Sequence, residues 1–360
     1  MKKVRLYFLD SMKGILITNV VLAHSMLTAA DAMETKNAWI IEFFSYFTIA
    51  AFFFISGFLY NNKTPDKPLK TIIHKVRVYY IPFVLFNVFY LACHNLFIKI
   101  HFLDGYLYDL KTFIKHFVLI FLGKMELSLN GPMWYLRSLL IMTVVYIIVE
   151  YLFYKIGDEK LKLILMGVLF IVMAQIGVLK LLPDNYNINQ TFYYIQFFYV
   201  GFLFKKFKIY EIIKKYKMLL FIVGFGIVIV LNLTTHAGTT TDYVLHFVKS
   251  FGAYSAIIAL VALTQFEKIE MFKFLHILGT ASLDIMSVHF LFFKPVTLFI
   301  IAISGYSIER LAETPVLFGV EGGWFVLYTL VAMALSTAFY YCRTSFMKKI
   351  KHIKPAKESK

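Results

Sequence analysis

Long apolar segments alternate with short polar segments along almost the whole chain of 360 residues. Ten of the apolar segments have the length of a membrane-spanning helix or slightly less, since about 20 helical residues cross the hydrocarbon core of a bilayer. They cover residues 14–30, 38–60, 78–98, 132–154, 161–182, 192–204, 218–233, 243–264, 275–303 and 322–342. The pattern predicts an all-α, polytopic membrane protein with about ten transmembrane helices.

Two of these segments depart from the expected length, and one further apolar run is too short to span. Segment 192–204 is short and segment 275–303 is long, so their boundaries are the least sharply defined. Residues 113–123 form an apolar run of only half the spanning length. This length favours an interfacial or re-entrant helix for that run.

Basic residues are distributed unevenly among the segments that separate the predicted helices. With the N terminus in the cytoplasm, 27 of the 37 Lys and Arg fall in cytoplasmic segments and 5 in outer segments. Because cytoplasmic loops carry an excess of Lys and Arg, this asymmetry predicts that both termini are cytoplasmic. The net charge of +16 is therefore mainly a sign of topology. The sequence predicts no nucleic-acid partner, since the charge is spread over many short loops.

The composition excludes a water-soluble globular protein. Hydrophobic residues make up 60% of the chain and charged residues 16%, far from the balance of soluble domains. The two cysteines, Cys93 and Cys342, lie far apart in apolar segments, so they support neither a disulfide framework nor a metal site. The first apolar segment lacks a small-residue cleavage site, and we expect it to remain in the membrane.

The first predicted span carries ionisable residues in an arrangement that indicates a functional site. Lys13 and His24 are eleven residues apart, so both side chains lie on one helix face, roughly 16 Å apart along the axis. Titratable groups within a span are costly and commonly mark a functional site. A neutral imidazole can accept the proton of a hydroxyl group, and a cation can hold an anionic donor. Asp10, three residues before Lys13, is placed to pair with it.

Five short motifs follow one another in order over nearly the whole chain. They are Leu9-Asp10-x-x-Lys13-Gly14 followed by Val20 to His24; the aromatic run Phe52 to Tyr60 around Ser56 and Gly57; Lys75-Val76-Arg77 leading into Tyr80 and Pro82; Pro132-Met133-Trp134-Tyr135-Leu136; and Leu278-Gly279-x-x-Ser282 continuing to His289. In this order the motifs resemble those of the membrane acyltransferase 3 family, and within it the branch of fucose 4-O-acetylase-like proteins. Each motif is weak by itself, and the five together carry the resemblance.

The resemblance implies an enzyme, a membrane-embedded O-acyltransferase that is most often an O-acetyltransferase. It would transfer an acyl group from cytoplasmic acyl-CoA, most often acetyl-CoA, to a hydroxyl of a cell-surface polysaccharide or a lipid-linked glycan. The expected location is the inner (plasma) membrane of a bacterial cell. Residues 1–343 would form the transmembrane acyltransferase domain, and residues 344–360 a basic cytoplasmic tail that anchors to the lipid bilayer. The sequence is compatible with a homodimer.

The resemblance also implies roles for residues at the cytoplasmic edge and in the first span. The catalytic residues would be His24, Asp10 and Lys13, with His24 as general base or acyl relay and Asp10 orienting the motif. Donor binding would involve Lys13, Lys75 and Arg77, whose charges suit the phosphates of acyl-CoA. The acyl-CoA is a substrate, and no metal and no resident cofactor is expected.

Two further groups of residues complete the expected site. Ser56 and Gly57 would let helices approach closely where the thin arm of the donor enters, and they are assigned to donor binding. Aromatic faces at the outer side could stack on a sugar ring. The residues assigned to acceptor binding are Trp134, Tyr135, Arg137 and His289.

The sequence departs from the family pattern at two places. The branch usually carries His-Met-Pro ahead of the aromatic run, where this chain has Thr48, Ile49 and Ala50. The basic residue of the first motif is Lys13, where many relatives have Arg, so a bidentate grip on phosphate is lost.

Two other classes of function compete with an acyltransferase. A transporter or lipid-glycan flippase would also use buried charges, although no inverted repeat is detectable in the sequence. A non-catalytic membrane scaffold is disfavoured by the clustering of Asp10, Lys13 and His24 in the first span.

Overall fold

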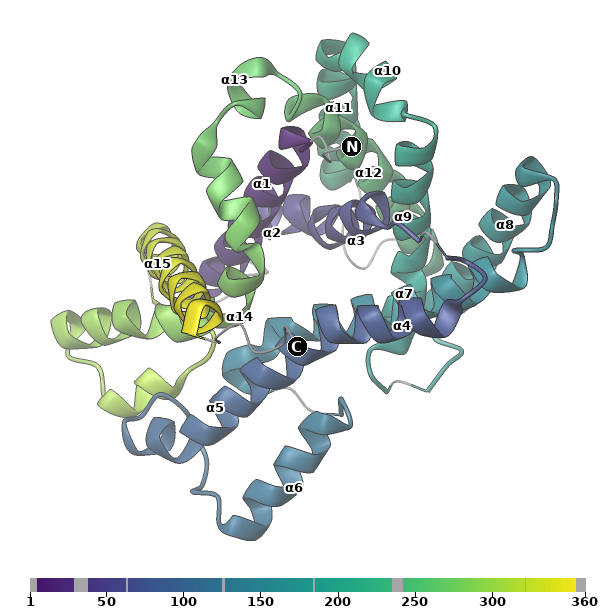
Figure 1. Cartoon of the computed structure of the whole chain (residues 1–360). Coiled ribbons are helices and arrows are strands. Elements are labelled where there is room, and N and C mark those ends of the chain that lie inside the picture. Colours follow the sequence, from purple (N-terminus) through teal and green to yellow (C-terminus); the bar gives the residue numbers. More distant parts are fainter. Residues whose placement is uncertain are drawn as a thin grey trace.

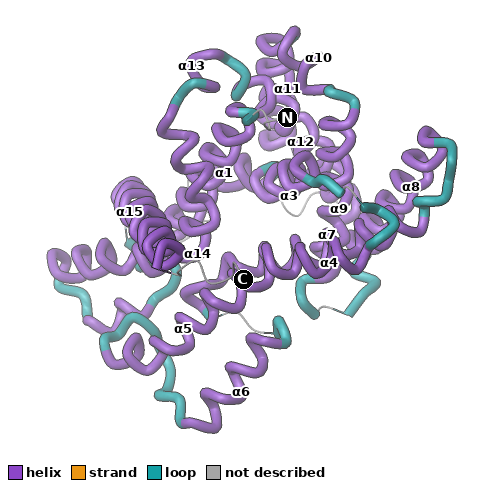
Figure 2. The backbone as a smooth tube through the Cα atoms, viewed as in Figure 1, coloured by secondary structure: helices purple, strands orange, loops and turns teal. Residues whose placement is uncertain are grey.

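The protein is helical throughout the part of the chain that its computed structural model describes. These residues are 5–28, 38–62, 64–124, 127–183, 185–234, 242–320 and 322–353. No β-strand occurs among them, as Figure 2 shows. The predicted all-α class is therefore confirmed.

Fifteen α-helices are connected by short loops and single helical turns over these ranges (Figure 1). The α-helices are α1 (Tyr7–Ser25), α2 (Ala38–Ser45), α3 (Thr48–Leu59), α4 (Pro68–Lys75), α5 (Ile81–Lys99), α6 (Leu110–Phe121), α7 (Trp134–Leu152), α8 (Glu159–Val178), α9 (Ile188–Lys206), α10 (Ile209–Lys215), α11 (Lys217–Thr234), α12 (Asp242–Leu263), α13 (Glu267–Glu270), α14 (Lys273–Ser304) and α15 (Trp324–Ile353). The additional turns are η1 (Met26–Thr28), the π-helical η2 (Val76–Tyr80), η3 (Ser128–Met133) and η4 (Ile308–Ala312).

Eight helical stretches within the described ranges are long and apolar enough to cross a membrane. They are Trp39–Leu59, Pro68–Lys99, Ser128–Leu152, Glu159–Val178, Lys217–Thr234, Val244–Leu263, Lys273–Ser304 and Trp324–Lys349. Eight of the ten predicted segments therefore reappear. The two others, α1 and α9, are each 19 residues long but more polar. Both pack against several other helices.

Helix α1 begins at Tyr7, earlier than the predicted start at residue 14, because its charges are paired. Asp10 accepts from Arg5 Nε at 2.6 Å and from Lys13 Nζ at 2.9 Å. The α-helix ends at Ser25, so His24 lies in its last turn. The predicted end of this span and the loop 31–37 lie outside the described residues.

Helices α1 and α14 touch backbone to backbone at two glycines. A Cβ atom on Gly14 would lie 2.3 Å from the carbonyl oxygen of Leu275, and one on Gly279 would lie 2.1 Å from that of Asp10. Small residues allow this close approach of helices in membrane proteins. Asp10 is level with Gly279, and His24 is level with His289, so the two helices run parallel.

Helices α3 and α9 approach each other in the same way. A Cβ atom on Gly57 would lie 1.8 Å from the carbonyl oxygen of Phe198, and one on Gly201 would lie 2.0 Å from that of Phe54. No side chain larger than hydrogen fits at either position without moving the backbone. Gly57 therefore faces α9, and the next residue towards the N terminus, Ser56, faces the interior of the helix bundle.

The segment before α7 enters the protein instead of staying at the surface. In η3, Leu129, Asn130 and Met133 are buried, and η3 packs between α5 and α14. Met133 Sδ accepts a hydrogen bond from Ser287 Oγ of α14 at 3.3 Å. Non-helical backbone at such depth is tolerated only where protein surrounds it. The start of α7 consequently lies deep among the helices.

The apolar run 113–123 belongs to α6, which is too short to span a membrane. Figure 1 shows α6 beside α5 and standing away from α1 and α3. One face of α6 is apolar and exposed, with Leu110, Ile114 and Phe121 more than half exposed. This arrangement agrees with the interfacial alternative predicted for the run, since an exposed apolar face suits a lipid boundary.

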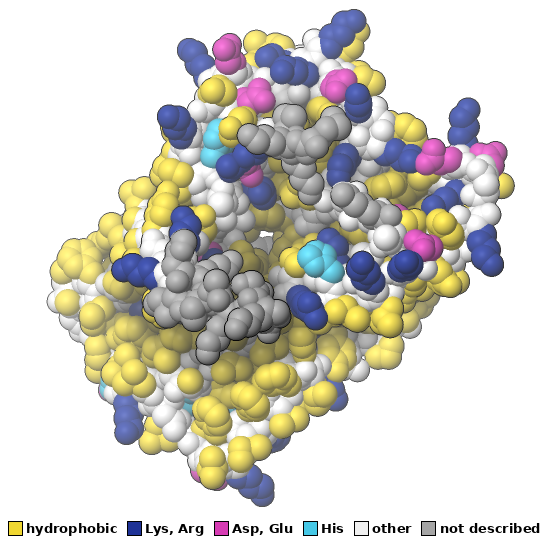
Figure 3. All heavy atoms as spheres, viewed as in Figure 1, with side chains coloured by type: hydrophobic (Ala, Val, Ile, Leu, Met, Phe, Trp, Pro, Cys, Tyr) yellow, Lys and Arg dark blue, Asp and Glu magenta, His cyan; other side chains and the backbone are white. Residues whose placement is uncertain are grey.

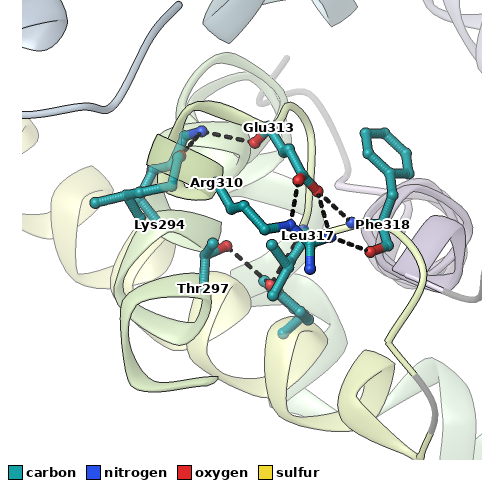
Figure 4. Close-up of polar contacts among 8 residues, drawn as sticks. Lys294, Thr297, Arg310, Glu313, Leu317 and Phe318 are labelled. Carbon is teal, nitrogen blue, oxygen red and sulfur yellow. Dashed lines mark hydrogen bonds and ion pairs between the residues drawn. The ribbon is translucent and has the colours of Figure 1, made fainter. Parts of the chain in front are cut away.

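The loop after α14 is held in place by a buried lysine (Figure 4). Lys294 Nζ donates to the carbonyl oxygens of Leu311 and Glu313 at 2.7 and 2.8 Å. The carboxylate of Glu313 accepts from Arg310 Nε at 2.6 Å and from the backbone N–H of Phe318 at 2.7 Å. All of these groups fold the loop back onto α14, so we interpret Lys294 as structural.

Candidate functional site

A cavity of about 430 Å³ lies among α1, α2, α3, α7 and α14. The lining residues with polar groups are Lys13, Asn19, His24, Ser45, Thr48, Ser56, Tyr79, Trp134, Tyr135 and Ser282. The rest of the wall is apolar. Figure 3 shows Lys and Arg side chains gathered around a central hollow, which lies between α3, α4 and α14 in the view of Figure 1.

Lys13 and His24 both line this cavity, as their spacing predicts. Helical geometry separates them by roughly 16 Å along α1. Lys13 is held at its position by the carboxylate of Asp10, whose second oxygen is bound by Arg5. Asp10 itself is not part of the cavity wall, and its carboxylate holds the lysine and neutralises part of its charge.

His24 forms a pair with His289 of α14. Nδ1 of His24 lies 3.2 Å from Nε2 of His289, and the two rings are stacked with their centroids 5.3 Å apart. His289 is 0% exposed and lies behind His24, outside the cavity wall. The edge of Phe290 packs against His24 with a centroid distance of 4.9 Å.

The positions of the protons in this pair follow from a backbone carbonyl group. His289 Nδ1 lies 2.8 Å from the carbonyl oxygen of Ile285, which can only accept, so Nδ1 carries a proton. Nε2 of the neutral His289 ring is then an acceptor, and it takes the hydrogen bond from His24 Nδ1. His24 is left with an unprotonated Nε2 on a ring that lines the cavity. That nitrogen is chemically suited to accept a proton from a substrate.

Ser56 and Tyr135 also line the cavity and contact each other. Their hydroxyl oxygens are 3.1 Å apart, and Ser56 Oγ donates to the carbonyl oxygen of Phe52 at 2.9 Å. The sequence assigned Ser56 to the donor and Tyr135 to the acceptor, on opposite sides of the membrane. The structure brings both residues into one cavity because α7 starts deep in the bundle.

Trp134 is the second residue assigned to the acceptor that the structure places in the cavity wall. The remaining two lie elsewhere. Arg137 is buried and donates to the carbonyl oxygen of Gly123 at 2.8 Å and to the side chain of Asn187, so it connects two loops. His289 reaches the cavity only through His24.

The side chains of Lys75 and Arg77 lie in different surroundings. The ammonium group of Lys75 lies over the rings of Tyr60 and Tyr79, at 5.4 and 5.5 Å, and Tyr79 lines the cavity. Within the described residues, Lys75 forms no ion pair, so it can attract an anion beside the cavity. Arg77 is exposed and borders a separate shallow groove with Lys70.

Several polar residues of the cavity wall were not singled out as site residues from the sequence. Asn19 and Ser282 are polar residues inside apolar segments, which is a signal that could have identified them. Thr48 stands where the family branch has a histidine, and its hydroxyl donates to the carbonyl oxygen of Phe44 at 2.8 Å. Tyr79 gave no signal, because an aromatic residue in an apolar segment can face either lipid or protein.

The structure offers no preformed metal centre among the residues that it describes. In ranges 5–28, 38–62 and the later described segments, no three His, Cys, Asp or Glu side chains are grouped to hold a metal ion.

The fold and this cavity define a polytopic membrane protein with a candidate catalytic site enclosed by its helices. Residues 6–341 match the family model described as an acyltransferase domain, which is that of the acyltransferase 3 family. The chain belongs to this family and is a membrane acyltransferase. The match covers every candidate site residue, and it confirms the family that the motifs indicated. Comparisons with curated proteins and with solved structures gave no match.

Proposed function

We propose that the protein is an O-acyltransferase that transfers an acyl group, most often acetyl, from cytoplasmic acyl-CoA to a hydroxyl of a cell-surface polysaccharide or lipid-linked glycan. The observation that carries this proposal is that Lys13 and His24, which is paired with His289, line one cavity within the family's acyltransferase domain. The fucose 4-O-acetylase-like branch and a bacterial plasma-membrane location are part of the proposal.

The proposed topology has ten spans and cytoplasmic termini. In that topology α1 and α14 are the first and ninth spans, so they cross in the same direction, and their packing is parallel. Helices α3 and α9 would be the second and sixth spans, and they are also parallel, since Phe53 stacks on Tyr194 and Tyr60 contacts Lys205. If α9 did not cross the membrane, α14 would cross in the direction opposite to α1, contrary to their parallel packing. These directions support counting both α1 and α9 as spans.

The polarity of α1 then orders the site across the membrane. Lys13 lies towards the cytoplasmic end of α1, and His24 lies towards the outer end. An acyl-CoA molecule would place its phosphates near Lys13 and Lys75 and extend its arm through the cavity towards His24. Because roughly 16 Å separates Lys13 from His24, an extended donor suits the site better than a compact one.

His24 supplies the base that the reaction requires. A sugar hydroxyl is too weak an acid to attack a thioester unaided, so Nε2 of His24 takes its proton as the oxygen attacks the carbonyl carbon. The carbon–sulfur bond then breaks, and the proton is delivered to the departing sulfur, which gives an ester and free CoA. Trp134 and Tyr135 offer aromatic faces in the same cavity for a sugar ring.

The proposal is tested by following radiolabelled acetyl groups from acetyl-CoA into surface polysaccharide in membranes that contain the full chain. We expect label with the wild type and a loss of at least about a hundredfold in His24→Ala, in line with loss of a general base. His276→Ala is the matched control, since His276 lies on α14 outside the cavity wall and binds the carbonyl oxygen of Glu270. Equal label in wild type and His24→Ala would contradict the mechanism. Accumulation of a solute without covalent acylation would indicate a transporter instead.

A further inference from the structure

His289 is a buried titratable residue in contact with the base, and it has no access to substrate of its own. It is 0% exposed, and its Nε2 is occupied by His24 at 3.2 Å. The rings of Phe290 and Phe293 pack against it with centroid distances of 4.7 and 5.7 Å. An acceptor glycan in the cavity therefore meets His24 and cannot reach His289.

The contact between the two rings fixes which nitrogen of His24 is protonated. If His24 carried its proton on Nε2, two lone pairs would face each other across 3.2 Å. His289 cannot relieve this conflict by moving its own proton, because its Nδ1 has to donate to the carbonyl oxygen of Ile285 at 2.8 Å. The carbonyl group of Ile285 in α14 thus favours this tautomer of His24 through His289.

Within the described ranges, the histidine pair has no carboxylate partner. Among the described residues, no carboxylate forms a hydrogen bond or ion pair with either ring, and the acid nearest in sequence, Asp284, is bound by Arg343 at 2.8 Å. A Ser-His-Asp triad places a carboxylate behind its histidine to stabilise the imidazolium ion. Here a second imidazole occupies that place, and an imidazole can take up the proton itself.

Given the proposed function, in which His24 is the base, we propose that His289 is a positioning residue that fixes the tautomer of His24 and holds a proton during acyl transfer. The hydroxyl proton moves to His24 Nε2 as the oxygen bonds to the thioester carbon. The proton on His24 Nδ1 moves to His289 Nε2 in the same step. His24 is then neutral in its other tautomer, and His289 is an imidazolium ion whose two N–H groups bind His24 Nδ1 and the Ile285 carbonyl.

The return of the protons balances the reaction. As the carbon–sulfur bond breaks, the Nε2 proton of His24 passes to the sulfur, and the Nε2 proton of His289 returns to His24 Nδ1. One hydroxyl and one thioester give one ester and one thiol, with both histidines restored. No oxidant, metal or further reactant is needed. The positive charge formed during the step passes to the ring of His289, at the place where a triad has a carboxylate.

The tautomer is tested directly by ¹⁵N NMR of histidine in the full-length protein in lipid bilayers, with the His24 signals assigned through His24→Gln. At neutral pH we expect a protonated Nδ1 and a bare Nε2 for His24, with a coupling across the hydrogen bond to His289. In His289→Phe we expect a mixture of the two tautomers. A wild-type His24 protonated on Nε2, or a tautomer that is unchanged in His289→Phe, would overturn the proposal.

The proton-holding role is tested by acetyl transfer from radiolabelled acetyl-CoA in the membranes described above. We expect His289→Phe to lower the rate by about a hundredfold. His289→Gln, whose amide can accept from His24 but cannot take up a proton, should recover only part of the loss. In mixtures of H₂O and D₂O, the wild-type rate should report two protons in transfer and that of His289→Gln one. A single proton in the wild type, or full activity of His289→Gln, would exclude proton holding.

The two proposals fail in different ways. If His24→Ala is inactive while His289→Phe and His289→Gln retain full activity, only the role of His289 is wrong. If His24→Ala retains full activity, the proposed function loses its base whatever the tautomer is. His276→Gln is the matched control for a histidine of α14 outside the cavity. Should His289→Phe fail to fold, His289→Gln, which keeps a polar side chain at this buried position, decides the question through its proton count.

Discussion

The hydroxyl groups of Ser56 and Tyr135 meet 3.1 Å apart inside the cavity, although 79 residues separate them in the chain. Ser56 donates its own proton to the carbonyl oxygen of Phe52, so the proton between the pair comes from Tyr135. This bond connects the cavity walls formed by α3 and α7. Residues that the sequence assigned to the donor and to the acceptor therefore share one chamber, so in the proposed function the two substrates would meet there.

Removing the Tyr135 hydroxyl should weaken this connection between α3 and α7, while the aromatic ring stays in the cavity wall. We expect Tyr135→Phe to lower the free energy of unfolding by about 1 kcal/mol, the net value of a typical hydrogen bond. Thermal unfolding of the purified protein measures this change. Tyr194→Phe is the matched control. Tyr194 packs on the ring of Phe53, as Tyr135 does, but it lies on α9 and does not join α3 to α7. Equal effects of both substitutions would show that the bridge adds nothing.

Replacing Lys13 should affect the binding of the donor. We expect Lys13→Ala to raise the KM for acetyl-CoA by about tenfold, because a hydrogen bond to a charged group contributes about 1.5 to 3 kcal/mol. Lys13→Arg should change it by less, since the charge is kept. Initial rates of label transfer at varied acetyl-CoA provide the measurement, with Lys268→Ala, an exposed lysine of α13, as control. The same KM in Lys13→Ala and wild type would show that Lys13 does not contact the donor.

A methyl group at Gly279 should push α1 and α14 apart. The added Cβ atom would lie 2.1 Å from the carbonyl oxygen of Asp10, so the backbones must move. We expect Gly279→Ala to lower the free energy of unfolding by about 1 to 3 kcal/mol, as overpacking commonly does, and to weaken the contact of His24 with His289.

The matched control for this substitution is Gly226→Ala in α11. A Cβ atom there meets nothing within 4 Å, so the methyl group causes no clash. We expect unchanged or slightly raised stability, since alanine favours the helix by about 1 kcal/mol over glycine. Thermal unfolding of both variants decides the matter, and equal stability of Gly279→Ala and Gly226→Ala would contradict the close contact.

Acidification should loosen α6 at the protein surface. Burial, followed by the charge of Lys115 and the neighbouring His94, lowers the pKa of His116 below its usual 6.5. The folded state then binds fewer protons than the unfolded state between these two pKa values. The stabilisation is thus complete above pH 6.5 and decreases as the pH falls towards the folded pKa.

Hydrogen exchange of the α6 amides between pH 7.5 and 5, corrected for intrinsic rates, measures this effect. We expect faster exchange at the acidic end in the wild type, because burial and the positive charge of Lys115 disfavour a charged His116. His116→Gln should remove most of the dependence on pH. If the variant and the wild type respond alike, His116 does not control the docking of α6.

Sequence patterns were sufficient to predict properties that depend on residues close together in the chain. Helical spacing placed Lys13 and His24 on one face, and both line the cavity. Hydrophobic patterning identified eight stretches that qualify as spans, and α1 and α9 fall short only in composition. These properties depend on neighbouring residues along one helix, so no knowledge of the tertiary packing is required.

Properties that depend on contacts between distant helices could not be predicted. The partner of His24 lies 265 residues away, and its position results from the glycine contact between α1 and α14. The depth of Tyr135 depends on the burial of η3, most of which precedes the predicted span 132–154. Lys75 and Arg77 are close in sequence but differ in surroundings, because residues two apart on a helix point in different directions.

The glycine contact has a consequence for how substrates enter. Where backbones touch, no compressible layer of side chains lies between them, so α1 and α14 move as one body that carries both imidazole rings. Across the cavity, α3 and α7 are joined by side chains, through the hydroxyl bridge of Ser56 with Tyr135 and the hydrogen bond from Tyr60, which follows α3, to Glu150 of α7. In the proposed function, His24 and His289 would therefore keep their spacing, and the chamber would widen at the opposite wall when a donor or acceptor passes.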